Sequence, residues 1–205
     1  MKRLRIQYLL VMLVMLGITG SSFAQTATQI LDKTASVIGR KGGAAANFKI
    51  NSTKYGSTSG TIAIKGNKFQ ATTPQAIIWY DGKTQWSYLK HTNEVNVSNP
   101  NQAQQMSMNP YTFINIYKSG YKATVTSKAG ANYTIRLYAN NQKRTVQEMY
   151  ITINKKSYIP SVVKMRQGKT WSTITVSNFK AKNQPNSVFV FNNKDYKSAE
   201  VIDLR

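Results

Sequence analysis

The chain has 205 residues, of which 28 are Lys or Arg, 7 are Asp or Glu, one is His and none is Cys. The lack of cysteine excludes disulfides and zinc-thiolate sites, so stability must come from hydrophobic burial. The one histidine, His91, lies among polar residues in a predicted turn, and the seven acids are scattered singly. This pattern indicates neither an acid/base pair nor a metal site, and we expect a protein that is not an enzyme.

Residues 1–24 have the composition of a secretory leader. Its parts are a basic start (Lys2, Arg3, Arg5), an apolar run (8–18) and a small-x-small cleavage signal (Ser22-Phe23-Ala24). The alternative is a membrane anchor, but the run is shorter than the roughly 20 residues that span a bilayer. No cysteine follows that an acyl group would anchor. We therefore expect a signal peptide, one domain over 25–205 and a periplasmic protein.

The charge of the remaining chain is strongly positive. Without the three basic residues of the leader, 25 basic residues stand against 7 acidic ones, a net charge of +18. Such a charge favours an anionic partner, either nucleic acid or a membrane surface. The basic residues form no cluster, and secretion removes the usual nucleic-acid target. We expect no nucleic acid as partner and a transient contact with anionic membranes.

Apolar and polar residues alternate from Phe48 to Phe179, with Gly, Asn and Asp at the breaks, which is typical of antiparallel strands. Gly66-Asn67 is a predicted two-residue turn that pairs Ile64 with Phe69 and Ile62 with Ala71. Further strands are expected near 121–125, 133–137, 149–153, 163–165 and 171–179. At least eight strands with few helices between them favour a strongly curved sheet or a barrel.

The segment 77–88 predicts a second hairpin, with Asp81-Gly82 as its turn. Its expected pairs are Tyr80 with Lys83, Trp79 with Thr84 and Ile77 with Trp86. This places Ile77, Trp79, Trp86 and Tyr88 on one apolar face. The opposite face, with Ile78, Tyr80, Lys83, Gln85 and Ser87, is expected to be the solvated one.

Helices are expected in two regions. Residues 28–38 carry an apolar stripe and are followed by Gly42-Gly43, which indicates an amphipathic helix and its stop. Residues 102–108 and 109–117 read as short helices, the second with Asn109 as N-cap and Pro110 after it. Both short helices are unusually apolar, so we expect them to cover an apolar surface. At the C-terminus, 188–191 and 199–204 are predicted short strands.

Four ordered motifs carry a resemblance to a known family. They are Gly60-Thr61-Ile62-Ala63-Ile64-Lys65 with Phe69, Trp79-Tyr80-Asp81-Gly82-Lys83-Thr84 with Trp86, Tyr88 and Glu94-Val95, Asn109-Pro110-Tyr111-Thr112-Phe113-Ile114, and Val201-Ile202-Asp203-Leu204-Arg205. Together they resemble the periplasmic outer-membrane lipoprotein carrier family, LolA, along nearly all of the chain after the leader.

The resemblance implies an α+β fold: a curved antiparallel sheet forms an unclosed β-barrel, covered by an N-terminal helix and short lid helices. It also implies a carrier that takes acylated lipoproteins from an inner-membrane transporter to an outer-membrane acceptor. We further expect a monomer without cofactor or metal. The residues expected to line the acyl cavity are Ile62, Ile64, Phe69, Ile77, Trp79, Trp86 and Tyr88. Those expected in the lid are Met106, Met108, Tyr111, Phe113 and Ile114.

The sequence departs from the family in one turn. Carriers of the best-known type have an Arg before the cavity Phe, thought to latch the lid, whereas this turn is Lys65-Gly66-Asn67-Lys68. Lys65 or Lys68 is the candidate substitute, although lysine lacks the planar fork of arginine. Two alternatives stay open. The apolar inner face either binds a ligand or is a packed core, and the domain either shuttles lipoproteins or is a lipid-binding sensor or lipid-transfer module.

Overall fold

A computed structural model describes residues 25–54, 56–101 and 116–205 of the chain. The predicted leader and the predicted lid residues Met106, Met108, Tyr111, Phe113 and Ile114 lie outside these ranges. Among the described residues, no helix is long and apolar enough to cross a membrane.

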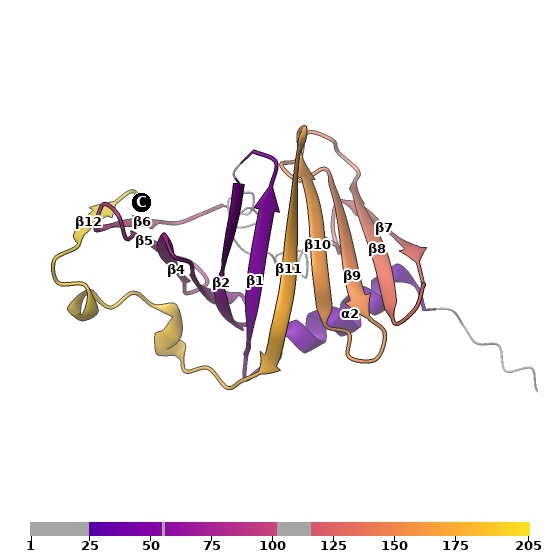
Figure 1. Ribbon diagram of the computed structural model, residues 1–205, viewed down its shortest axis with the longest axis horizontal. Helices are drawn as coiled ribbons and strands as arrows, with labels where there is room; N and C mark the ends of the chain where they lie inside the picture. Colours follow the sequence, from indigo (N-terminus) through magenta and orange to yellow (C-terminus); the bar gives the residue numbers. More distant parts are fainter. Residues whose placement is uncertain (1–24, 55, 102–115) are drawn as a thin grey trace, which may run out of the picture.

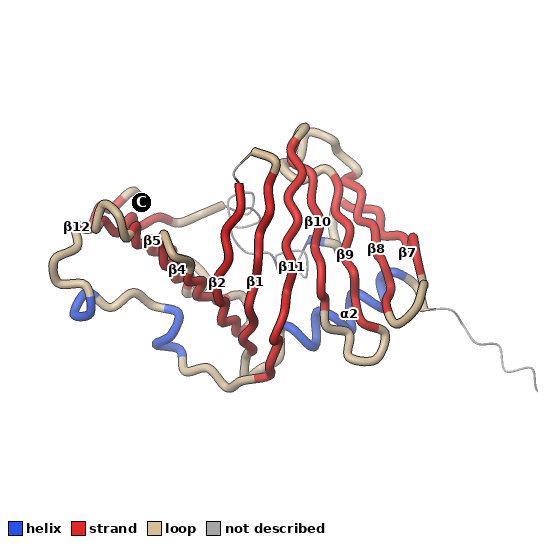
Figure 2. Tube along the Cα trace, viewed as in Figure 1, coloured by secondary structure: helices blue, strands red, loops and turns tan. Residues whose placement is uncertain are grey.

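The molecule is built on one twelve-stranded sheet with the order β12-β6-β5-β4-β3-β2-β1-β11-β10-β9-β8-β7 (Figures 1 and 2). Neighbouring strands are antiparallel, except that β12 runs parallel to β6. Because β12 and β7 end the order without pairing to each other, the barrel is unclosed, which confirms the predicted fold. The strands are β1 (Ala44–Ser52), β2 (Gly56–Lys65), β3 (Lys68–Thr72), β4 (Ala76–Tyr80), β5 (Gln85–Leu89), β6 (Glu94–Ser98), β7 (Tyr121–Ser127), β8 (Asn132–Ala139), β9 (Glu148–Asn154), β10 (Pro160–Gln167), β11 (Thr170–Ala181) and β12 (Glu200–Asp203).

The helix α2 (Ala27–Ile38) lies against the half of the sheet formed by β7–β11 (Figure 1). It starts with a capping box, in which the backbone N–H of Gln29 donates to Thr26 Oγ1 and the backbone N–H of Thr26 donates to Gln29 Oε1. Its buried stripe packs into one core with side chains from both halves of the sheet. We call the face of the sheet that contributes to this core the inner face, and the opposite face the outer face.

The β2–β3 hairpin forms as the sequence predicts. Ile64 lies opposite Phe69 and Ile62 opposite Ala71 across the Gly66-Asn67 turn. Directly opposed residues point to the same side of a sheet, so these four side chains share the inner face, where all four are buried.

The predicted pairing of the β4–β5 hairpin is wrong by two positions. Tyr80 lies opposite Gln85 and Trp79 opposite Trp86, so the two central turn residues are Gly82 and Lys83. The cause is the Asp81 carboxylate, which accepts the backbone N–H groups of Lys83 and Thr84 at 2.8 Å each. Asp81 therefore occupies the first corner of the turn, and Gly82 takes the left-handed conformation that follows, with φ +104°.

Within the hairpin the predicted faces are confirmed, because Ile77 lies opposite Tyr88 and Trp79 opposite Trp86. The β3–β4 connection, however, contradicts the prediction that this side of the hairpin is shared with Phe69. Phe69 lies opposite Tyr80, and Gln70 opposite Trp79. Tyr80 and Ile78 therefore lie on the inner face with Phe69, whereas Trp79 and Ile77 point outward. The register is fixed by a tight turn, in which the Thr73 N–H donates to the Ala76 carbonyl and the Thr73 hydroxyl bonds the same residue.

The outer face of β3–β6 is covered by residues 182–205, which we call the C-terminal strap. The strap contains two 3-10 turns, η1 (Asn186–Phe189) and η2 (Asn193–Asp195), before β12, so the predicted strand at 188–191 is replaced by η1 whereas that at 199–204 is confirmed. Phe189 is fully buried. Trp79 meets Phe191 and Tyr196 with ring centroids 5.6 and 5.5 Å apart. The strap thus buries Trp79, whereas the other outward apolar side chains of β4 and β5 are partly exposed: Ile77, Trp86 and Tyr88.

On the outer face of β8–β10 a buried carboxylate joins three strands. Glu148 accepts from Arg136 Nε at 2.7 Å, from Arg166 Nε at 3.4 Å and from the Tyr150 hydroxyl at 2.9 Å. Burial alone would raise the pKa of the Glu148 carboxyl, but the hydrogen bonds from Tyr150 and Arg136 outweigh it, so the pKa is lowered.

Replacing Glu148 by glutamine is expected to reduce the free energy of unfolding at pH 7 by about 1–2 kcal/mol, because charge-assisted hydrogen bonds are lost. A carboxyl whose pKa is depressed by folding stabilises the protein above its unfolded pKa, and that stabilisation is lost as the pH falls through the folded value. Urea unfolding between pH 6 and pH 3 should therefore show a steeper loss of stability in the wild type than in Glu148→Gln. The exposed Glu200→Gln is the control, and equal slopes in wild type and Glu148→Gln would contradict the assignment.

Candidate functional site

The candidate site is an apolar patch on the inner face of β2, β3 and β4. Its members, here called the inner patch, come from two rows of directly opposed residues: Ile64, Phe69 and Tyr80 in one, and Ile62, Ala71 and Ile78 in the other. All are buried except Ile78, which is half-buried and packed against the core. The patch therefore presents aliphatic and aromatic carbon without a charged side chain.

Two aromatic rings form the centre of the inner patch. Phe69 and Tyr80 are tilted at 38° with ring centroids 5.6 Å apart. The Tyr80 hydroxyl donates to the Gly82 carbonyl at 2.9 Å, which turns the polar end of the ring toward the hairpin turn. Burial, and then the nearby Asp81 carboxylate, raise the pKa of Tyr80. The ring is therefore neutral at physiological pH and contributes an uncharged surface.

Polar atoms without partners also occur among the buried side chains. Gln85 Oε1, beside the inner patch, and Thr34 Oγ1, on the buried stripe of α2, make no hydrogen bond within the part of the chain described. An unpaired buried polar group costs roughly 1–3 kcal/mol. Their number is small compared with the carbon surface around them, so the inner face suits a largely apolar ligand with few polar groups.

The predicted cavity residues divide between the two faces of the sheet. Ile62, Ile64 and Phe69 lie on the inner face as expected. Ile77, Trp79, Trp86 and Tyr88 lie on the outer face, and the strap covers part of them, with Tyr88 and Tyr196 4.7 Å apart between ring centroids. The prediction that all seven line one surface is wrong.

Sequence reasoning missed Ile78 and Tyr80 because the β4 sequence Ala76-Ile77-Ile78-Trp79-Tyr80 is apolar at both alternating positions. A strand that is apolar on both sides indicates that both sides are covered. The prediction of one solvated face for this hairpin, with Ile78 and Tyr80 on it, is therefore wrong.

The proposed latch residues also lie elsewhere than expected. Lys65 and Lys68 oppose each other at the end of the β2–β3 hairpin, one position out of step with Ile64 and Phe69, and so belong to the outer face. The Lys65 ammonium donates to the Gln184 carbonyl at 2.8 Å and so holds the start of the strap. The lid that a latch would reach lies outside the described residues, and the latch stays a prediction.

The end of the lid segment is tied to α2 by a different contact. The Tyr117 hydroxyl donates to Asp32 Oδ1 at 2.5 Å, and the Lys118 ammonium lies 3.6 Å from the same oxygen. Burial and then the bond to Asp32 raise the pKa of Tyr117 far above its usual value, so this donor persists at all physiological pH. The residues that follow the predicted lid segment are thereby fixed to the helix.

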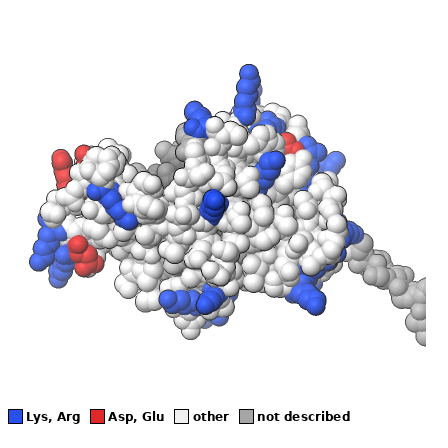
Figure 3. All heavy atoms as spheres, in the orientation of Figure 1, with Lys and Arg blue, Asp and Glu red and all other residues white. Residues whose placement is uncertain are grey.

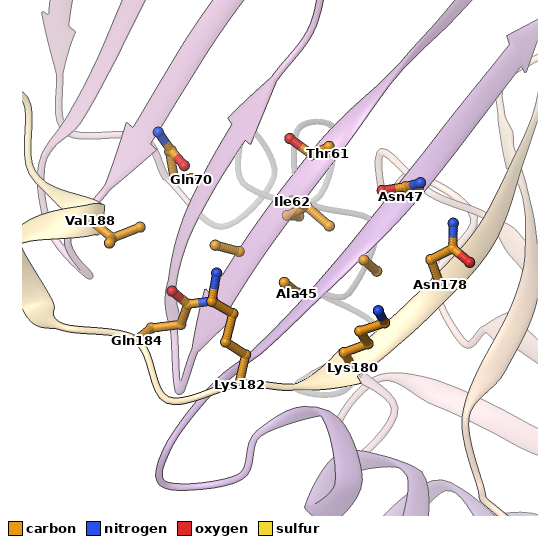
Figure 4. Close-up of a pocket in the computed structure, with 12 residues that line it drawn as sticks. Ala45, Asn47, Thr61, Ile62, Gln70, Asn178, Lys180, Lys182, Gln184 and Val188 are labelled. Atoms are coloured by element: carbon orange, nitrogen blue, oxygen red, sulfur yellow. The ribbon is translucent and has the colours of Figure 1, made fainter.

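Apart from the inner patch, a hollow lies on the outer face, where β1–β3 meet the end of β11 and the strap (Figure 4). It has a volume of about 700 Å³, and Lys180, Lys182 and Gln184 stand at its side. Among the described residues, no group of three or more His, Cys, Asp or Glu side chains is placed to hold a metal ion.

An unclosed antiparallel barrel with a helix packed on its apolar inner face defines the class of protein. The chain belongs to the LolA family: residues 19–169 match the family model described as outer membrane lipoprotein carrier protein LolA. The whole of β11 and the strap lie beyond the matched range. No curated protein sequence matches the chain.

Several solved structures are similar to this chain at low sequence identity, and the first of those described next shares its fold. An uncharacterized conserved protein of Thermus thermophilus is 14% identical, with a TM-score of 0.59 over 86% of this chain and 98% of its own. A LolA superfamily protein of Nitrosomonas europaea is 13% identical, with a TM-score of 0.46 over 82% and 99%. An outer membrane lipoprotein-sorting protein domain of Vibrio parahaemolyticus is 8% identical, with a TM-score of 0.48 over 82% and 97%.

Proposed function

We propose that this protein is a periplasmic carrier that binds lipoprotein acyl chains against its inner face and shuttles lipoproteins from the inner to the outer membrane. The observation that carries the proposal is the inner patch. Its two rows of uncharged apolar side chains span three strands in a chain of the LolA family. Ile78 is half-buried at the margin of the core, whereas the other members of the patch are buried, and we infer that an acyl chain first contacts the patch at this residue.

The energetics of acyl burial favour such a ligand. Each buried methylene contributes about 0.8 kcal/mol, so partial burial of two or three acyl chains supplies ample affinity. Release is the harder step for a carrier, and the methionines predicted in the lid, Met106 and Met108, have the flexible side chains that suit an adaptable cover.

The charge of the protein supports a role near membranes. Lys and Arg are spread over the surface, with few Asp and Glu among them (Figure 3). Such a surface is attracted to anionic headgroups without needing a discrete site, and the attraction is screened by salt. It would bring the carrier close to the inner-membrane transporter that loads it and to the outer-membrane acceptor.

The shuttling role is tested by release of cargo. Purified protein lacking residues 1–24 is incubated with spheroplasts of its own host, and newly made lipoproteins are sought in the supernatant in complex with it. We expect release, and we expect the complex to survive 1 M salt because acyl burial is not screened as charge pairing is. If the folded protein releases nothing while the export machinery is intact, the carrier role is refuted, and a lipid-binding sensor or transfer module becomes the better description.

A further inference from the structure

The hollow on the outer face, which we call the outer pocket, opens on the side of the sheet opposite the proposed acyl site and shares with it only Ile62 of β2. Its floor is one row of side chains across four strands, in which Ala63 opposes both Gln70 and Ala45, and Ala45 opposes Lys180 (Figure 4). The short side chains of the two alanines form a depression between the longer side chains of Gln70 and Lys180. The volume of about 700 Å³ is within the range of small-molecule sites.

One wall of the outer pocket is held rigidly. The backbone N–H of Gln184 donates to the backbone carbonyl of Gly42 at 2.8 Å. The backbone carbonyl of Gln184 accepts from the Lys65 ammonium at 2.8 Å. The backbone next to Gly42 also lies close to β2. A Cβ at Gly43 would lie 2.5 Å from the Ile64 carbonyl oxygen, so this position requires glycine. The strap is thus fixed where it passes the pocket, so the wall does not have to form when a ligand binds.

The polar groups around the outer pocket favour an anion. Gln184 is 7% exposed, and it lines the hollow. Lys180 and Lys182 are exposed at the rim, and no Asp or Glu is among the described residues that line the hollow. Two lysines and a glutamine therefore line one hollow, without a carboxylate in the lining to repel an anion.

We propose that the outer pocket binds an organic phosphate of the size of glycerol phosphate. A phosphate group has several oxygens that accept hydrogen bonds. The donors are the side chains of Lys180, Lys182 and Gln184. The alanine floor contacts the carbon skeleton of the ligand. The volume exceeds what inorganic phosphate fills, so the organic part contributes contacts. The same chemistry is offered by a free metabolite and by a phospholipid headgroup, and the site is independent of acyl binding on the inner face.

The test uses sn-glycerol 3-phosphate and the protein without its leader. Backbone amide NMR shifts of Ala45, Ala63 and Gln70 are expected to change saturably, beyond the change caused by sodium chloride at equal ionic strength. The double variant Lys180→Ala/Lys182→Ala should weaken binding about tenfold or more. The matched control Lys194→Ala/Lys197→Ala removes the same charge from strap residues that do not line the pocket, and it should bind like wild type.

A second variant separates shape from charge. Ala63→Leu keeps the charge and fills the floor of the outer pocket, and we expect it to weaken binding similarly. Flotation with phosphatidylglycerol vesicles then distinguishes the source: loss of vesicle binding in Lys180→Ala/Lys182→Ala but not in the control identifies a lipid headgroup, and no difference identifies a free phosphate. The proposal is overturned if the shifts do not saturate, if chloride reproduces them, or if both double variants weaken binding equally.

Discussion

Replacing Ile78 by glutamate is expected to weaken binding of acyl chains by more than about 100-fold while the protein stays folded. Ile78 lies at the margin of the inner patch and is only half-buried, so the change puts a carboxylate beside bound hydrocarbon without placing it in the centre of the core. Bringing a charge out of water against an apolar ligand costs several kcal/mol, and each 1.4 kcal/mol is a factor of ten. The measurement is titration with a fluorescent fatty acid, together with the spheroplast release assay.

The neighbouring isoleucine provides a matched control. Ile77 has the same residue type, the same strand and the same class of exposure, but it points to the outer face, opposite Tyr88. The Ile77→Glu variant should therefore bind fatty acid like wild type. The conservative Ile78→Val variant should retain most of the affinity of the wild type. Circular dichroism melts check that all three variants are folded. If Ile77→Glu and Ile78→Glu lose affinity equally, the ligand does not bind at the inner patch.

Replacing Phe189 by alanine is expected to lower the free energy of unfolding by about 3–5 kcal/mol, the usual cost of removing a fully buried aromatic ring. Phe189 is 0% exposed and lies in η1, which packs on β3 and β4. A loosened strap would expose Trp79, which is buried against Phe191 and Tyr196. Urea unfolding measures the stability change, and a red shift of tryptophan emission in the folded state reports the exposure of Trp79.

The control for this prediction is the next residue in the strap. Val190 is 41% exposed, so Val190→Ala should change stability by less than about 0.5 kcal/mol and leave the emission spectrum unaltered. A loss below about 1 kcal/mol in Phe189→Ala would mean that the strap contributes little to the stability of the sheet. The outer pocket would then lack a firm wall as well, because the strap forms that wall.

Much of the fold follows from local patterns in the sequence. The capping pair Thr26 and Gln29 starts the helix close to the expected position, and the Gly66-Asn67 turn sets the pairing of Ile64 with Phe69. These features depend on residues a few positions apart, whose backbone preferences act in the same way in any context. The antiparallel class of the sheet follows from many such turns in succession.

The face of β4 that meets the inner core was decided by the tertiary structure. Ile77 and Ile78 are chemically identical, and the strand is apolar on both sides, so alternation alone cannot assign them. The β3–β4 turn places Phe69 opposite Tyr80 and thereby puts Ile78 inside, and the strap arrives from more than 100 residues later in the chain to bury Trp79 outside. By itself the sequence determined the helix, the turns and the class of sheet, because these arise from short-range preferences. The two opposite apolar surfaces and the outer pocket arise only where distant segments meet, because their shape and burial depend on long-range packing.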